Sequence, residues 1–147
     1  MKACGDTMDE RDKNRILVKL DDMTRYINEL RDMLPSRQEY LDDLVKRRAC
    51  EKTVESAIEC MIDAGAIIVS AEKLGLPRDE ESIFDLLAGH GVIPEGVSRR
   101  AKEMKGFRNI LIHRYADVDD KIVYHHLSHR LSDFQAFREA VESFLKR

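Results

Sequence analysis

The sequence predicts an all-α fold, an up-and-down bundle of four to five helices. Charged residues make up 36% and hydrophobic residues 43% of the chain, with only seven Gly and three Pro. This composition suits helices that each keep one solvated face. Apolar residues recur three and four positions apart, and short connections between these stretches favour antiparallel neighbours. At 147 residues the chain is long enough for one domain, which we assign to residues 9–147, with residues 1–8 as a flexible N-terminal extension.

The first helix is expected from Asp9 to Leu34, where Pro35 ends it. Ser36 followed by Glu39 matches a capping box, so a second helix should begin there and run to Lys73 before Gly75. Each helix carries one apolar seam. The two seams are Ile16, Leu20, Met23, Ile27, Leu30 and Leu34, and Cys50, Val54, Ala57, Met61, Ala64 and Ile68. Ala57, Ala64 and Gly65 are small, so another helix could approach closely there.

Three more helices are expected after a short linker. One runs from Glu80 to Ala88, with Asp79 as its N-cap. The next runs from Pro94 to Tyr115, because proline suits a first helical turn. The last follows Asp119 and continues to Lys146, with a buried side made of Val123, Leu127, Leu131, Phe134, Val141 and Phe144.

Cysteine usage and hydropathy indicate a cytoplasmic protein. Cys4, Cys50 and Cys60 are odd in number and form no CxxC motif, which favours free thiols, with Cys50 and Cys60 buried. The start of the chain lacks the apolar run of a signal peptide. The longest mostly apolar stretch, residues 60–71, is too short to cross a bilayer and carries Asp63, so no membrane span is expected.

Within the helix predicted from Pro94 to Tyr115, the stretch from Val97 to Tyr115 contains most of the residues that point to a function. It contains one acid, Glu103, and six basic residues, a formal charge of +5 in a chain of net charge −3. Anions should be drawn to this helix, although a pI near 6.0 argues against a general nucleic-acid coat and we expect no DNA partner. The basic residues are Arg99, Arg100, Lys102, Lys105, Arg108 and Arg114.

The end of this helix combines Arg108, Asn109 and His113. Arg108 projects into an arc of apolar residues, so its guanidinium must meet a carboxylate, reach out of the bundle, or face a cleft at a subunit boundary. On a straight helix Arg108 and His113 point about 140° apart and lie about 7.5 Å apart along the axis. They could still flank one phosphodiester in a groove, which a second copy of the helix would help to build.

These groups suggest RNA cleavage that needs no metal and no cofactor. His113 would act as general base or acid, Arg108 would bind the phosphate, and Asn109 would orient the imidazole or the RNA backbone. The ribose 2′-hydroxyl would attack the adjacent phosphate. Lys102, Lys105, Arg114 and, on the second helix, Arg48 are candidates for contacts with RNA. Spacing alone equally allows an ion-paired arginine and a surface histidine.

The segment FRNILIHRYADVD, residues 107–119, and the segment YLDDLVKRRACEKTVESAIECMIDA, residues 40–64, resemble the HepT-like toxins of the HEPN superfamily. Their pattern of Arg, four residues, His, one residue and Tyr matches Arg108, His113 and Tyr115, and the likeness spans residues 16–144. The resemblance implies a dimeric helical bundle with RNase activity. It also implies a minimal nucleotidyltransferase antitoxin as partner, which transfers AMP to the motif tyrosine, here Tyr115.

Two other interpretations remain open on the sequence. A non-catalytic module could present nucleotide or substrate to a nucleotidyltransferase, and a purely structural bundle would use Arg108 for stability only. His125, His126 and His129 form a second cluster, and the i,i+4 pair within it occurs in metal sites. We expect a solvated helix face there, or one auxiliary phosphate contact.

Overall fold

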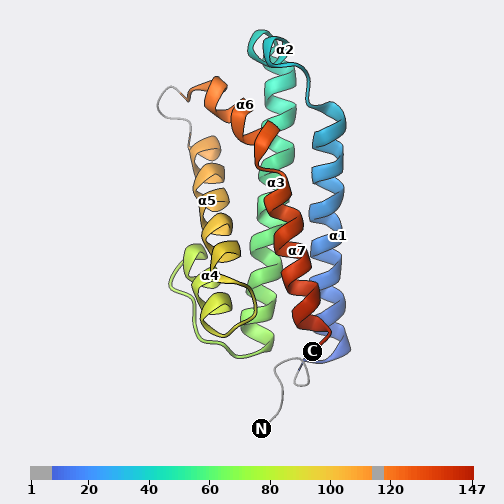
Figure 1. Ribbon diagram of the computed structural model, residues 1–147, viewed down its shortest axis with the longest axis vertical. Coiled ribbons are helices and arrows are strands. Elements are labelled where there is room, and N and C mark those ends of the chain that lie inside the picture. The colour runs from blue at the N-terminus through green and yellow to red at the C-terminus, as the bar shows by residue number, and fades with distance from the viewer. Residues whose placement is uncertain (1–7, 114–117) are drawn as a thin grey trace.

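The computed structural model describes residues 8–113 and 118–147, and these residues form seven helices (Figure 1). The all-α class is confirmed, but the number of helices exceeds the four to five predicted. The helices are α1 (Glu10–Met33), α2 (Arg37–Asp42), α3 (Leu44–Ala71), α4 (Glu80–Gly89), α5 (Glu95–Ile112), α6 (Asp120–His129) and α7 (Ser132–Leu145).

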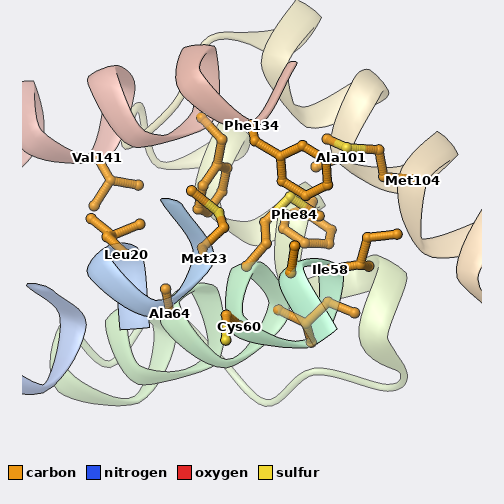
Figure 2. Close-up of a cluster of buried hydrophobic side chains, with 14 of the residues drawn as sticks. Leu20, Met23, Ile58, Cys60, Ala64, Phe84, Ala101, Met104, Phe134 and Val141 are labelled. Carbon is orange, nitrogen blue, oxygen red and sulfur yellow. The ribbon is translucent and has the colours of Figure 1, made fainter. Parts of the chain in front are cut away.

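The long helices α1, α3, α5 and α7 run side by side, with α4 beside α5 and the short α2 and α6 at one end (Figure 1). The predicted apolar seams point into their shared core, which Figure 2 shows between α1, α3, α4, α5 and α7. Leu20 and Ile58 are fully buried there, as is Phe137, which the sequence analysis missed. Cys50 and Cys60 are buried free thiols as predicted, and burial raises the pKa of Cys50 to about 11.

The predicted second helix is wrong in one respect, because Asp43 divides it into α2 and α3. Asp43 has an extended backbone, and its N–H donates to the carbonyl of Glu39, which ends α2. Its carboxylate accepts from the N–H groups of Val45 at 3.0 Å and Lys46 at 3.2 Å, which caps α3. The predicted apolar seam begins only at Cys50, so it gives no information about a break at Asp43.

The predicted final helix is likewise two helices, separated at Arg130 and Leu131. The Arg130 guanidinium donates to Asp133 at 2.9 Å and to Glu103 of α5 at 2.6 Å. These bonds hold the bend against α5. As a result α6 packs against α2 while α7 turns to pack along α1 and α5.

Glycine lets α4 lie close to α3, as the small residues of the second seam suggested. A Cβ on Gly65 would meet the side chain of Ile83 at 3.0 Å and that of Leu87 at 3.3 Å. The N-cap of α4 is Asp79, as predicted, and its carboxylate accepts from the N–H of Ser82. This packing fixes α4 beside α5, the helix that carries the predicted catalytic residues at its end.

Met8, the last residue of the expected N-terminal extension, is 5% exposed and packs in the core. Residues 1–7 of the expected extension lie outside the described residues. None of the helices in residues 8–113 and 118–147 combines the length and the apolar character that a bilayer crossing requires.

Candidate functional site

The end of α5 positions the three residues predicted to be catalytic. Arg108 and Asn109 lie in the last turn, and His113 directly follows the helix, where its N–H donates to the carbonyl of Asn109 at 2.9 Å. The expectation that the helix continues to Tyr115 is not met, since α5 ends at Ile112. His113 is exposed, which suits a group that must reach a substrate.

Arg108 meets a carboxylate, the first of the three outcomes considered for it. Its side chain is buried against α4, where Nη2 lies 2.5 Å from Oε1 of Glu80 and Nη1 lies 3.5 Å from Oε2. Nη2 also donates to Oδ1 of Asn109 at 3.1 Å. The side-chain oxygen of Asn109 thus contacts Arg108, and its expected role in orienting the imidazole or the RNA backbone stays a prediction. Nε of Arg108 is buried without a hydrogen-bond partner among the described residues.

Arg108 and His113 face different neighbours within one protomer. The guanidinium of Arg108 points to α4, while His113 lines a cavity of about 720 Å³ between α5 and α6. Arg108 is not among the described residues that line this cavity. A single protomer therefore does not bring the two side chains together, and a shared groove requires a second copy or a movement of Arg108.

Three cations of α5 are paired with carboxylates of α4, which weakens the attraction for anions that was expected of this helix. Nζ of Lys102 lies 2.8 Å from Asp85, and Nζ of Lys105 lies 3.9 Å from Glu81. Arg108 and Glu80 continue the same antiparallel ladder. An RNA phosphate must therefore compete with these carboxylates or share the cations with them.

Arg48 lies on α3 and is also paired. Its Nη1 donates to both carboxylate oxygens of Glu51, at 3.1 and 3.2 Å, and Glu51 is only 5% exposed. The other two predicted residues, Arg114 and Tyr115, lie outside the described residues. The structure thus leaves the RNA-contact and modification assignments as predictions.

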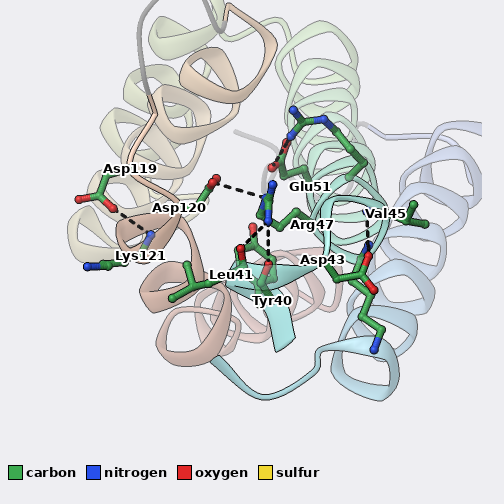
Figure 3. A network of polar contacts seen from close by, with 11 residues as sticks. Tyr40, Leu41, Asp43, Val45, Arg47, Glu51, Asp119, Asp120 and Lys121 are labelled. Carbon is green, nitrogen blue, oxygen red and sulfur yellow. Dashed lines mark hydrogen bonds and ion pairs between the residues drawn. The ribbon is translucent and has the colours of Figure 1, made fainter. Parts of the chain in front are cut away.

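A polar network beside the site ties three helices together (Figure 3). Nη1 of Arg47 donates to the carbonyls of Tyr40 at 3.2 Å and Leu41 at 2.7 Å, at the end of α2. Nε of the same side chain lies 3.4 Å from Asp120, the first residue of α6. Arg47 thereby connects α3 with the ends of α2 and α6, which sets where α6 begins after the site.

Across the cavity from α5, α6 contributes a second imidazole. The ring of His126 stacks on Phe107 with a centroid distance of 4.6 Å and an interplanar angle of 18°. Burial lowers the pKa of His126, and the charges of Arg130 and His125 lower it further. This ring is therefore held mainly in its neutral form at pH 7.

The other histidines of α6 do not form a metal site among the described residues. His125 and His129 stack with a centroid distance of 4.2 Å, and Nδ1 of His129 lies 3.0 Å from both the carbonyl of His125 and Oγ of Ser128. In residues 8–113 and 118–147 no group of three or more His, Cys, Asp or Glu side chains is arranged around a common point. A metal site at His125 and His129 would therefore lack a third ligand among the described residues.

Sequence reasoning missed Glu80, Glu51 and the place of His126 beside His113. The acids of α4 could have been found, since Glu80, Glu81 and Asp85 form a stripe complementary to the cations of α5. No local signal marks Glu51 as buried, because it follows a run of charged residues.

Comparison with known proteins places the chain among RNA-cleaving enzymes. The family model described as ribonuclease HepT-like matches residues 23–141. The mRNA nuclease HepT of Shewanella oneidensis is 27% identical over 128 residues, which is 87% of this chain and 96% of that protein. The tRNA nuclease HepT of Aphanizomenon flos-aquae is 23% identical, over 88% of this chain and 89% of that protein.

A solved structure agrees with these sequence matches. The tri-AMPylated Shewanella oneidensis HEPN toxin, in complex with its MNT antitoxin, superposes with a TM-score of 0.83 at 26% identity, covering 88% of this chain and 97% of that chain. YutE, a cytosolic protein of Bacillus subtilis, shares the fold with a TM-score of 0.77 at 18% identity, over 95% and 92% of the two chains.

Proposed function

The chain belongs to the ribonuclease HepT-like family, and from this premise we propose that it is a metal-independent endoribonuclease toxin, neutralised by a minimal nucleotidyltransferase antitoxin. The observation that carries the proposal is His113, which is exposed directly after α5 on a cavity of about 720 Å³, four residues after Asn109 and five after Arg108. The protein would act in the cytoplasm on RNA.

His113 takes the proton from a ribose 2′-hydroxyl, whose oxygen then attacks the adjacent phosphorus. The bond from phosphorus to the 5′-oxygen breaks, and that oxygen leaves with a proton from an imidazolium or from water. The products are a 2′,3′-cyclic phosphate and a 5′-hydroxyl. Because the nucleophile is the 2′-hydroxyl, DNA is not a substrate. Arg108 stabilises the charge that develops on the phosphate oxygens.

A homodimer supports this chemistry, because Arg108 and His113 of one protomer face different neighbours. The apolar residues Ile110, Ile112 and Ile122 are 55%, 44% and 58% exposed around the end of α5 and the start of α6. Contact with a second copy would bury part of this apolar surface, leave the cavity between α5 and α6 open to the groove between the copies, and place two copies of His113 in that groove. Arg108 of one protomer and His113 of the other could then act on one phosphate.

Neutralisation would follow from AMP transfer to Tyr115. The solved relative is tri-AMPylated and bound to an MNT antitoxin, which supports the same pairing here. Tyr115 lies two residues after His113, so each AMP adds a phosphate charge and bulk next to the catalytic imidazole. RNA is then excluded by like charge and by steric hindrance.

The test is cleavage of a defined RNA by the full chain in the presence of EDTA, with His113→Ala, Arg108→Ala and His90→Ala compared. His90, an exposed residue directly after α4, serves as the control. We expect His113→Ala to lower kcat by at least about 100-fold, the contribution of general acid–base catalysis, and His90→Ala to leave it unchanged. Cleavage that depends on added metal, or that survives in His113→Ala, contradicts the mechanism. A variant Arg108→Ala that loses stability but cleaves RNA normally would assign Arg108 a structural role.

The antitoxin assignment has a separate test, the intact mass after co-expression with a minimal nucleotidyltransferase. We expect mass increments of one or more AMP units that are absent in Tyr115→Phe. A protein that neither cleaves RNA nor gains this mass would instead support a non-catalytic binding module.

A further inference from the structure

The cavity between α5 and α6 has walls that suit a flat, uncharged ring. Phe107 and Ile110 of α5 face Ile122 and Val123 of α6 across it. Of the described residues that line it, none is lysine or arginine, whereas Glu103 and Asp119 contribute carboxylates. A phosphate group is therefore poorly matched to its interior. An aromatic base, with apolar faces and N–H donors at its edge, matches both kinds of wall.

The stacked pair of Phe107 and His126 supplies a ready surface for such a ring. Phe107 is buried at 8% exposure, whereas His126 is half-buried, so the imidazole is the more accessible member of the stack. The charged and titratable groups near His126 are Glu103 from α5, His125 from α6, Arg130 directly after α6, and Asp133 from α7. Burial, together with the nearby guanidinium of Arg130, lowers the pKa of His126, which favours stacking over ionic contact.

The position of His113, the proposed catalytic residue, indicates which molecule would occupy the cavity. His113 lines the same cavity as His126, so a chain whose phosphate lies at His113 places a neighbouring base at the cavity. A volume of about 720 Å³ lies within the range of small-molecule sites and is ample for one base with its ribose.

We propose that this cavity is a nucleobase subsite, which holds one base of the RNA beside the cleaved phosphate, stacked on His126 and hydrogen-bonded by the carboxylates of Glu103 and Asp119. The inference rests on the proposed function for the source of the base. Each carboxylate already accepts one hydrogen bond, Oε2 of Glu103 from Arg130 and Oδ1 of Asp119 from the N–H of Lys121. These bonds hold the two acceptors in place at the cavity.

The first test measures steady-state cleavage of a short RNA by wild type, His126→Ala, His126→Phe and the control His129→Ala, an exposed residue on the same helix. Removing a stacking partner typically weakens binding of a base about 5- to 150-fold, so His126→Ala should raise KM by that factor with kcat within about 2-fold. His126→Phe retains a stacking face and should keep KM within about 3-fold. Equal losses in both variants, or an unchanged KM in His126→Ala, would overturn the proposal.

The second test separates this site from the nuclease activity. Wild-type protein is titrated with the four nucleoside 3′-monophosphates, and with ribose 5-phosphate as the control that lacks a base, while the C2 protons of the histidines are followed by NMR. Saturable shifts of His126 with at least one nucleotide, with none at His90 and none for ribose 5-phosphate, support the subsite even if no RNA is cleaved. Equal shifts with ribose 5-phosphate, or no shift at His126 in a protein that does cleave RNA, overturn the subsite and leave the nuclease standing.

Discussion

The guanidinium of Arg108 is held by Glu80, a residue 28 positions earlier in the chain, with Nη2 2.5 Å from Oε1. The arginine that the motif assigns to phosphate binding is thus already engaged by a carboxylate of α4. Lys102 and Lys105 are paired with the same helix, so α4 supplies counter-charges to three cations of α5, whereas Arg100 pairs with Asp133 of α7. This relationship leads to the first prediction.

Replacing Glu80 by Gln should strengthen RNA binding. The substitution removes the charge that competes with phosphate while leaving an amide that can still contact Arg108, and we expect the Kd for a non-cleavable RNA to fall several-fold. Loss of a charged hydrogen bond should lower the free energy of unfolding by about 1–3 kcal/mol. Glu81→Gln is the matched control, because the contact of Glu81 with Lys105 is longer, at 3.9 Å. Weaker RNA binding in Glu80→Gln would mean that the carboxylate positions Arg108 for its substrate.

Enlarging Gly65 should destabilise the fold through the contact between α3 and α4. The side chains of Ile83 and Leu87 leave little room for a Cβ, so Gly65→Val forces an overpacked interface, and we expect a cost of about 1–3 kcal/mol in urea unfolding. Gly106→Ala is the contrasting variant, since no atom lies within 4 Å of its added Cβ. It should stabilise α5 by about 0.5–1 kcal/mol. Equal effects of the two variants would contradict this account of the close approach.

Removing the cap at Asp43 should weaken the junction of α2 and α3. Asp43→Ala loses the carboxylate that accepts from Val45 and Lys46, and an N-cap of this kind contributes about 1 kcal/mol. Asp43→Asn keeps an acceptor and should retain most of that stability. Thermal unfolding of both variants by circular dichroism provides the measurement, and an unchanged Tm in Asp43→Ala would show that the break is held by other contacts, such as those of Arg47.

His126 should make stability depend on pH in the mildly acidic range. Its pKa is lowered in the folded protein, first by burial and then by Arg130 and His125, whereas the unfolded chain has an ordinary value near about 6.5. Below that pH the unfolded state binds more protons at this position, so the stabilisation is present above about pH 6.5 and is lost as the pH falls through the folded-state pKa. Wild type should therefore lose stability relative to His126→Phe as the pH is lowered from 7 to 5. Urea unfolding at several pH values measures this difference, and a constant difference would contradict the prediction.

Much of the fold could be predicted from local sequence, because helices depend on interactions between residues three and four positions apart. The seam from Ile16 to Leu30, the cap at Asp79, the burial of Cys50 and the close approach at Gly65 are all confirmed. Family membership confirms the expectation of a HepT-like ribonuclease. The functional roles of Arg108, Asn109 and His113 stay predictions, as do the dimer and the modification of Tyr115.

The sequence by itself determined where apolar faces lie, which residues can start a helix, and that Arg108, Asn109 and His113 share the end of one helix. Only the tertiary structure decided that Glu80 neutralises Arg108 and that His126 stacks on Phe107 beside the cavity of His113. Helical periodicity records which side of a helix is apolar, but it does not encode which distant side chain is brought against it. Those pairings arise when the bends at Asp43 and Arg130 and the packing of α4 on Gly65 set the positions of whole helices.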